Sequence, residues 1–146
     1  MSSNPTRTDQ QTVVFELGEE QFGVDIFRVN EIIRLPEVTQ IPKTDPNLMG
    51  LVNLRGENIP VIDLKGRLGL PGGESTDRAR IIVIESETGH TGILVDQVQE
   101  VITLKGEQIE RAPSIASDPS NDFIVGVARH NDSLISLLDL DQVLAA

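Results

Sequence analysis

The two halves of the chain carry the same order of residue types, and this internal repeat limits the possible folds more than any other feature. The run Val13 to Glu16 matches Ile82 to Glu85, and the same spacing pairs Gly23 with Gly92, Val29 with Val98, Glu31 with Glu100, Ile33 with Ile102 and Leu35 with Leu104. After a few inserted residues, Pro42 matches Pro113, Gly50 matches Gly126, Ile62-Asp63-Leu64 matches Leu138-Asp139-Leu140 and Leu68 matches Leu144. Each copy exceeds the ~20–50 residues of a solenoid or propeller unit, so each is expected to form a whole small unit.

Each copy consists of short apolar runs separated by turn residues, which is typical of strands. The first copy is expected to hold hairpins over 12–25 and 50–64, a strand over 31–42 and a short helix over 64–69 that Asp63 can cap. The second copy is expected to hold strands at similar positions, with a loop over 112–122.

These elements predict an all-β fold of two similar five-stranded SH3-like β-barrels, because closing each sheet removes its exposed edges. We expect a flexible tail over 1–11 and one folded domain over 12–146. Within that domain, the first barrel would span about 12–69 and the second about 78–138, with a break near 66–78 and a helical turn over 139–146.

The charge balance indicates protein partners. The 146 residues include 12 Lys and Arg against 23 Asp and Glu, a net charge of -11, which would repel phosphates and disfavours nucleic acid as a partner. No cysteine is present, no apolar run is long enough to span a membrane and the first residues are polar. We therefore expect a cytoplasmic protein that does not insert directly into a membrane.

Residue patterns that mark catalytic or cofactor sites are missing from the sequence. It has no dinucleotide, P-loop or nucleophile-elbow motif and no calcium loop. His90 and His130 are expected in exposed turns, and four aspartates at strand ends are expected to cap turns: Asp25, Asp63, Asp96 and Asp139. We therefore expect no enzyme, no catalytic residue, no metal site and no cofactor. A hydrolase that uses these aspartates is a less favoured alternative.

Arg55 stands out as a basic residue in an otherwise apolar hairpin. Its apolar neighbours would limit its solvation, which favours a fixed guanidinium paired with a carboxylate such as that of Glu31. The alternative is a solvated turn residue.

Three runs of the sequence resemble the CheW family of chemotaxis coupling proteins: VVFELGEEQFGVDIFRVNEIIRL, GLVNLRGENIPVIDLKGRL and GILVDQVQEVITLKGEQIERAP. The resemblance extends from about Thr12 to Leu144. It implies two five-stranded barrels, in agreement with the repeat. It also implies a non-enzymatic adaptor that joins the cytoplasmic tips of methyl-accepting chemotaxis receptors to the regulatory domain of the histidine kinase CheA. Such an adaptor would be recruited to membrane receptor arrays.

The resemblance also implies roles for particular residues. Receptor-binding residues, expected in a groove between the barrels, would be Val29, Glu31, Arg55 and Ile81. Kinase-binding residues would be Thr39, Ile41, Leu48, Met49 and Gly50, and a second interface that closes a ring with a neighbouring CheA would include Ile109, Pro113 and Ile115. Ordinary packing remains an alternative for Val29, Ile81, Met49 and Ile115. A coupler in a parallel pathway for twitching or surface signalling, and a detached CheA-like regulatory domain, are alternatives for the whole protein.

Overall fold

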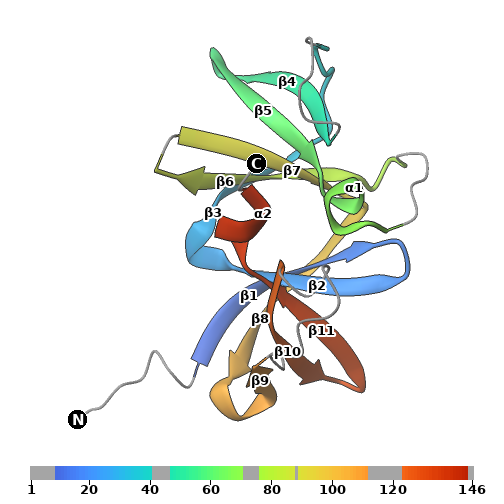
Figure 1. The fold of residues 1–146 in the computed structure, drawn as a ribbon, viewed down its shortest axis with the longest axis vertical. Coiled ribbons are helices and arrows are strands. Elements are labelled where there is room, and N and C mark those ends of the chain that lie inside the picture. Colours follow the sequence, from blue (N-terminus) through green and yellow to red (C-terminus); the bar gives the residue numbers. More distant parts are fainter. Residues whose placement is uncertain (1–8, 41–46, 71–75, 88, 112–122, 145–146) are drawn as a thin grey trace.

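The computed structural model describes residues 9–40, 47–70, 76–87, 89–111 and 123–144, which form two curled sheets. The six-stranded sheet contains β1 (Asp9–Leu17), β2 (Glu20–Asp25), β8 (Gln97–Lys105), β9 (Ile109–Arg111), β10 (Ile124–His130) and β11 (Ser133–Leu138), in the order β8-β1-β2-β11-β10-β9. The five-stranded sheet contains β3 (Val29–Arg34), β4 (Leu48–Leu54), β5 (Glu57–Asp63), β6 (Arg80–Ser86) and β7 (Gly89–Val95), in the order β3-β6-β7-β5-β4. Figure 1 shows the five-stranded sheet above and the six-stranded sheet below. The all-β, two-barrel class expected from the sequence is confirmed.

The repeat is confirmed in the detailed pairing of the strands. In both copies the first two strands form a hairpin, with Val13 opposite Val24 in one and Ile82 opposite Ile93 in the other. The parallel pairs also match, since Leu137 lies opposite Gly23 and Val61 opposite Gly92. Bulges recur at equivalent positions, between Leu48 and Gly50 in β4 and between Ile124 and Gly126 in β10.

The expected division into a barrel over 12–69 and a second over 78–138 is corrected by this topology, because the two copies exchange strands. β1 pairs with β8 of the second copy, Phe15 facing Val98, and β3 pairs with β6, Val29 facing Ile84. One sheet therefore combines β1 and β2 with β8 to β11, and the other combines β3 to β5 with β6 and β7. The chain crosses between sheets at the short 3-10 helix η2 (Ile26–Arg28) and again at Asp96. The expected break near 66–78 falls between β5 and β6, which belong to the same five-stranded sheet.

Alternation along the strands creates three apolar cores. Val13, Phe15 and Leu17 of β1 and Ile82 and Ile84 of β6 point into a central cluster between the sheets. Residues on the opposite faces of these strands fill the two barrel interiors: Val14 joins Ile102, Leu104, Ala128, Ile135 and Leu137 in one, and Ile81 and Val83 join Val52, Ile59 and Val61 in the other. The interior residues of the two barrels are largely the aligned residues of the two copies.

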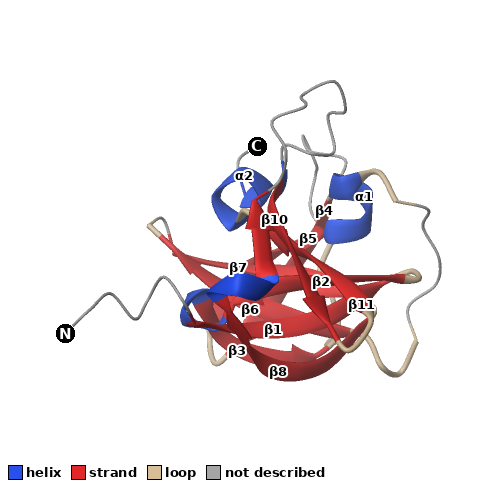
Figure 2. Ribbon diagram, turned by 90° about the horizontal axis from the view of Figure 1, so that it is seen from below, coloured by secondary structure: helices blue, strands red, loops and turns tan. Residues whose placement is uncertain are grey.

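Two one-turn helices complete the central core. α1 (Leu64–Leu68) supplies Leu64 and Leu68, and α2 (Leu140–Leu144) supplies Leu140 and Val143. Both helices lie on the same side of the strands (Figure 2). The expected helix after Asp63 is confirmed, but the Asp63 side chain does not cap it. The structure begins β1 at Asp9, inside the expected tail.

Candidate partner-binding site

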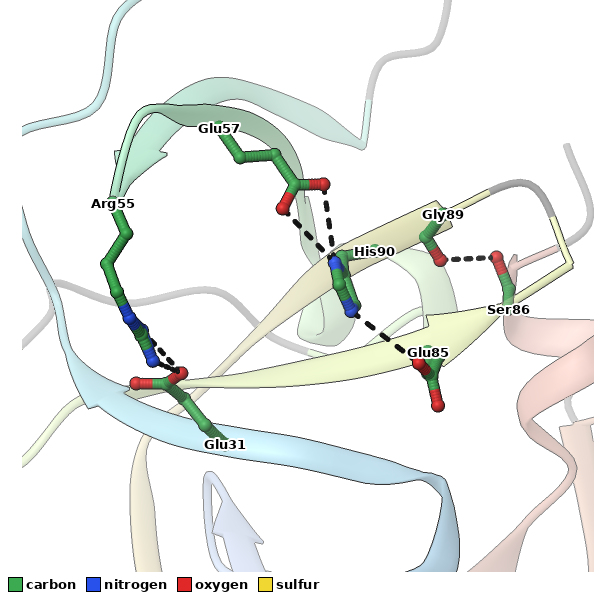
Figure 3. Close-up of polar contacts among 7 residues, drawn as sticks. All are labelled: Glu31, Arg55, Glu57, Glu85, Ser86, Gly89 and His90. Atoms are coloured by element: carbon green, nitrogen blue, oxygen red, sulfur yellow. Dashed lines mark hydrogen bonds and ion pairs between the residues drawn. The ribbon is translucent and has the colours of Figure 1, made fainter.

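Glu31 and Arg55 meet at one end of the five-stranded sheet, as the sequence analysis expected. Arg55 Nη1 donates to Glu31 Oε1 at 2.8 Å, and Nη2 contacts the same oxygen (Figure 3). The two residues do not come from adjacent strands, since Glu31 lies in β3 and Arg55 in the turn between β4 and β5. β3 and β4 are the two edges of this sheet, so the ion pair links the edges of a curled sheet.

Arg55 is more exposed to solvent than its apolar neighbours in the sequence suggested. Its side chain is 67% exposed and that of Glu31 is 27% exposed, so apolar neighbours do not limit the solvation of Arg55. The turn itself positions the residue: Arg55 has φ 51° and Gly56 has φ 87°, two successive left-handed residues of the kind that tight hairpins require. The aligned residues Asn131 and Asp132 adopt the same conformation, with φ 50° and 66°.

Val29 and Ile81 occupy different environments. Val29 is half-buried, begins β3 directly after the crossover helix η2 and packs against the central core between the sheets. Ile81 is fully buried inside the five-stranded barrel, so it cannot form the direct receptor contact that the family resemblance implied. The alternative of ordinary packing is correct for Ile81. A Cβ added to Gly92 would lie only 2.6 Å from Cγ2 of Ile81, so the Ile81 side chain packs directly against this glycine.

A second polar cluster lies beside the Arg55 pair. His90 Nδ1 lies 3.3 Å from both carboxylate oxygens of Glu57, and its Nε2 lies 3.9 Å from Glu85 Oε2 (Figure 3). The expectation of an exposed turn for His90 is wrong, since the residue lies in β7 and its side chain is only 26% exposed. This cluster could not be predicted from local sequence patterns, because Glu57 and His90 meet only where β5 lies beside β7.

The residues expected to contact the kinase surround the start of β4. The N–H of Thr39 donates to Leu51 O at 2.7 Å, and the N–H of Leu51 donates to Thr39 O at 2.8 Å, so the chain after β3 closes the barrel onto β4. A Cβ on Gly50, which has φ 150°, would overlap the Thr39 carbonyl oxygen. Thr39 is exposed, whereas Gly50 is buried. Ile41 lies outside the described residues.

Leu48 and Met49 are half-buried. Met49 packs against the interior core of the five-stranded barrel, which supports the packing alternative for this residue. Its aligned partner in the second copy, Val125, is 49% exposed.

The matching region of the six-stranded sheet is described only in part. Ile109 begins β9, is half-buried and packs against the interior of that barrel. Glu110 of β9 lies opposite Val127 of β10, and this pair corresponds to the pair of Thr39 with Leu51 in the other sheet. Pro113 and Ile115 lie outside the described residues.

Two of the four aspartates, Asp25 and Asp139, cap the turn that follows them, as expected. Asp96 instead forms long-range contacts, and the Asp63 side chain makes no capping bond. Asp25 Oδ1 accepts from the N–H of Phe27, and Asp139 Oδ1 accepts from the N–H groups of Asp141 and Gln142. Asp96 Oδ2 accepts from the Gly18 N–H at 2.6 Å while its other oxygen pairs with Lys65 at 3.0 Å. Among the described residues, no group of three or more His, Asp or Glu side chains is arranged to hold a metal ion.

A search for membrane spans over the described residues finds no helix with the length and apolar character needed to cross a bilayer.

Comparison with known proteins decides the family. The family model described as the CheW-like domain matches residues 11–146. The chain belongs to the CheW-like domain family. It is 34% identical over 138 residues to the chemotaxis protein CheW of Rhizobium meliloti, covering 94% of this chain and 89% of that protein. It is 32% identical over 138 residues to the chemotaxis protein CheW of Bacillus subtilis, covering 94% of this chain and 88% of that protein.

A solved structure agrees with this CheW-like fold. The crystal structure of the scaffolding protein TtCheW from Thermoanaerobacter tengcongensis matches with a TM-score of 0.86 and 37% sequence identity, covering 94% of this chain and 93% of that chain. The family resemblance noted from the three sequence runs is thereby confirmed.

Proposed function

We propose that this CheW-like protein is a non-enzymatic adaptor that couples the cytoplasmic tips of chemoreceptors to the histidine kinase CheA in chemotaxis signalling. The observation that carries the proposal is the match along nearly the whole chain to proteins named as chemotaxis and scaffolding proteins. As an adaptor, the protein would act through differential contacts with its partners and not through a reaction. It would work in the cytoplasm, recruited to receptor arrays.

The receptor contact is proposed at the end of the five-stranded sheet where Val29, Glu31 and Arg55 lie. Val29 and Glu31 follow directly after the crossover η2, so they lie where the chain passes from one sheet to the other. A receptor tip is a helical hairpin, and a half-buried valine flanked by an exposed Arg–Glu pair offers an apolar anchor with groups that can fix orientation. Ile81 is buried in the interior of the barrel, so it is left out of the proposed surface.

The kinase contact is proposed around Thr39 and the start of β4, with Leu48 and Met49 contributing their exposed parts. This surface and the Arg55 pair lie on one sheet but involve different parts of β4, its beginning and the turn after its end. A single barrel can therefore present separate surfaces to two partners. The ring contact with a neighbouring CheA, through the region that begins at Ile109, remains a proposal of the same kind.

The decisive experiment is a pull-down with a receptor cytoplasmic fragment and with CheA, separately and together. The proposal expects binding to each partner alone and a complex of all three when they are mixed. Absence of binding to both partners would overturn it. A coupler of a parallel pathway would bind the receptor and kinase of that pathway instead, so the same assay with those partners separates the two functions.

A further inference from the structure

His90 is held between two carboxylates at the end of the five-stranded sheet that also carries Arg55. Glu57, the first residue of β5, faces Nδ1 with both oxygens at 3.3 Å. Nε2 is buried, makes no hydrogen bond within the described residues and lies 3.9 Å from Glu85 Oε2 in β6. Figure 3 shows this cluster beside the Arg55–Glu31 pair.

The charge of the imidazole determines whether both of its nitrogens can donate to the carboxylates that face them. A neutral imidazole carries one N–H, so if Nδ1–H donates to Glu57, Nε2 presents a lone pair toward the Glu85 carboxylate. A protonated imidazole has an N–H on both nitrogens, and each then faces a carboxylate. Histidine is the side chain whose charge normally changes between about pH 5 and 8.

The cluster is connected to Arg55 through the hairpin of β4 and β5. Glu57 begins β5, and Arg55 lies two positions earlier in the turn of the same hairpin. Glu31 approaches from β3 at the opposite edge of the sheet, so the Arg55–Glu31 geometry depends on where the hairpin end is held. His90 in β7 contacts Glu57 at that end of the hairpin.

We propose that His90 is a positioning residue for the Arg55–Glu31 pair, and that its protonation draws in the β4–β5 hairpin and tightens receptor binding at that pair. The effect on binding rests on the proposed receptor-coupling function, whereas the positioning of Arg55 can be measured in the protein alone.

The charged groups around His90 are consistent with this role. Glu57 faces it from β5 and Glu85 from β6. Arg28 of η2 donates to the main-chain oxygen of Glu85 at 3.4 Å and pairs with Asp141 at 3.1 Å, so its charge is directed to α2 and not to the imidazole. Loss of the His90 proton therefore leaves two carboxylates facing a neutral ring.

The first arm of the test follows the free protein by NMR from pH 5 to 8.5. The Arg55 Nε–H signal, assigned with the Arg55→Lys variant, is expected to shift with the same midpoint as the ring protons of His90. In His90→Gln the Arg55 signal is expected to stay constant, since glutamine keeps a hydrogen-bond donor but does not titrate in this range. An Arg55 signal that ignores pH in the wild type, or that still shifts in His90→Gln, would overturn the proposal.

Two further variants separate positioning from general effects. His130→Gln is the matched control, because His130 ends β10 at the corresponding end of the other sheet and contacts Asn131 at 3.3 Å. It should leave the Arg55 shift unchanged. Glu57→Gln changes an exposed side chain and should reduce the shift, which provides a second measurement if His90→Gln does not fold. An undiminished shift in Glu57→Gln would contradict transmission through this residue.

The second arm measures the affinity of a receptor cytoplasmic fragment at pH 6 and pH 8. The wild type and His130→Gln are expected to bind about threefold to fivefold more tightly at pH 6, the scale of a partly exposed ion pair, and His90→Gln equally at both pH values. Equal pH dependence in wild type and His90→Gln would overturn the effect on binding. Absence of binding at either pH would count against the proposed function, while the NMR arm would still decide whether His90 positions Arg55.

Discussion

Arg55 reaches Glu31 from a left-handed backbone position at the tip of a hairpin, and the ion pair that results is expected to add little to the stability of the fold. Exposed ion pairs contribute from about 0 to 1 kcal/mol to stability, because water screens the charges and two long side chains must be held in place. At 67% exposure, Arg55 falls in that class. Its value to the protein is therefore expected in partner binding.

Truncation of this pair provides a test at the residue scale. Arg55→Ala and Glu31→Ala should each lower receptor-fragment affinity by about tenfold, the size of an ordinary hot-spot loss, while the free energy of unfolding changes by less than about 1 kcal/mol. The double variant should lose less than the sum of the two single losses, because the residues act as a pair. Isothermal titration calorimetry and urea denaturation measure the two quantities.

Strictly additive affinity losses would show that Glu31 and Arg55 act independently. Unchanged affinity in all three variants would place the receptor surface elsewhere on the molecule.

At the scale of elements, the junction of Thr39 with β4 depends on a glycine. Gly50 has φ 150°, and a methyl group there would overlap the Thr39 carbonyl oxygen that accepts the Leu51 N–H. Gly50→Ala should therefore break the bridge that closes the barrel and lower the free energy of unfolding by more than about 2 kcal/mol. Chemical denaturation measures the loss.

The second copy supplies the control for this substitution. Gly126 lies at the aligned position, does not have a positive φ, and a Cβ there would be 2.9 Å from the Glu110 carbonyl oxygen. Gly126→Ala is expected to cost less than Gly50→Ala. The reverse order would contradict the account of strain at Gly50.

The start of β4 also provides a test of the kinase surface. Met49→Asp should weaken binding of the CheA regulatory domain by about 100-fold, because it would place a charge in an apolar interface, and should leave receptor binding little changed. Some loss of melting temperature is expected as well, since Met49 packs on the barrel interior. Pull-down and calorimetry with each partner measure the two affinities.

Val125→Asp is the matched control, because Val125 occupies the aligned position in β10 and is 49% exposed. It should retain binding to the isolated regulatory domain. Equal loss of both partners in Met49→Asp would instead indicate that the protein has unfolded.

At the scale of the whole molecule, the exchange of strands makes each sheet depend on both halves of the chain. A cut introduced between Leu70 and Thr76 would separate the halves covalently, but β1 pairs with β8 and β3 with β6 across the two halves, and these ladders should hold the fragments together. The two fragments should therefore elute together in size-exclusion chromatography and unfold in one cooperative transition. Fragments that separate and remain folded under native conditions would show that each half can close a barrel alone.

Local features of this fold were predictable from the sequence, but the pairing of strands between the two copies was not. Apolar runs and turn residues located the hairpins and the helix at 64–68, and the repeat indicated two similar barrels. Because the copies are alike, Val98 would make a similar apolar contact with Phe15 or with the aligned residue Ile84. The observed pairing requires the chain to cross between the sheets at η2 and at Asp96, and no local sequence pattern marks these crossings.

The site follows the same pattern. The Arg55–Glu31 pair was anticipated because a single basic residue stood in an apolar hairpin, although the exposure of Arg55 shows that limited solvation is not what fixes it. The burial of Ile81 was not, since a β-branched residue at the start of a strand can face either side. The His90 cluster depends on β5 lying beside β7, a contact between distant segments that no local pattern indicates.

The reciprocal exchange of strands also bears on the origin of the molecule. A chain with a single copy of the repeat and the same strand pairing would be a homodimer with a twofold axis, each subunit completing the other. Joining two such genes end to end would turn that dimer into one polypeptide, in which the two equivalent surfaces could mutate separately. One surface now carries the Arg55–Glu31 pair, and its counterpart has Asn131 aligned with Arg55 and Glu100 aligned with Glu31. Fusion of this kind would let an ancestral symmetric dimer become a connector with two unlike faces.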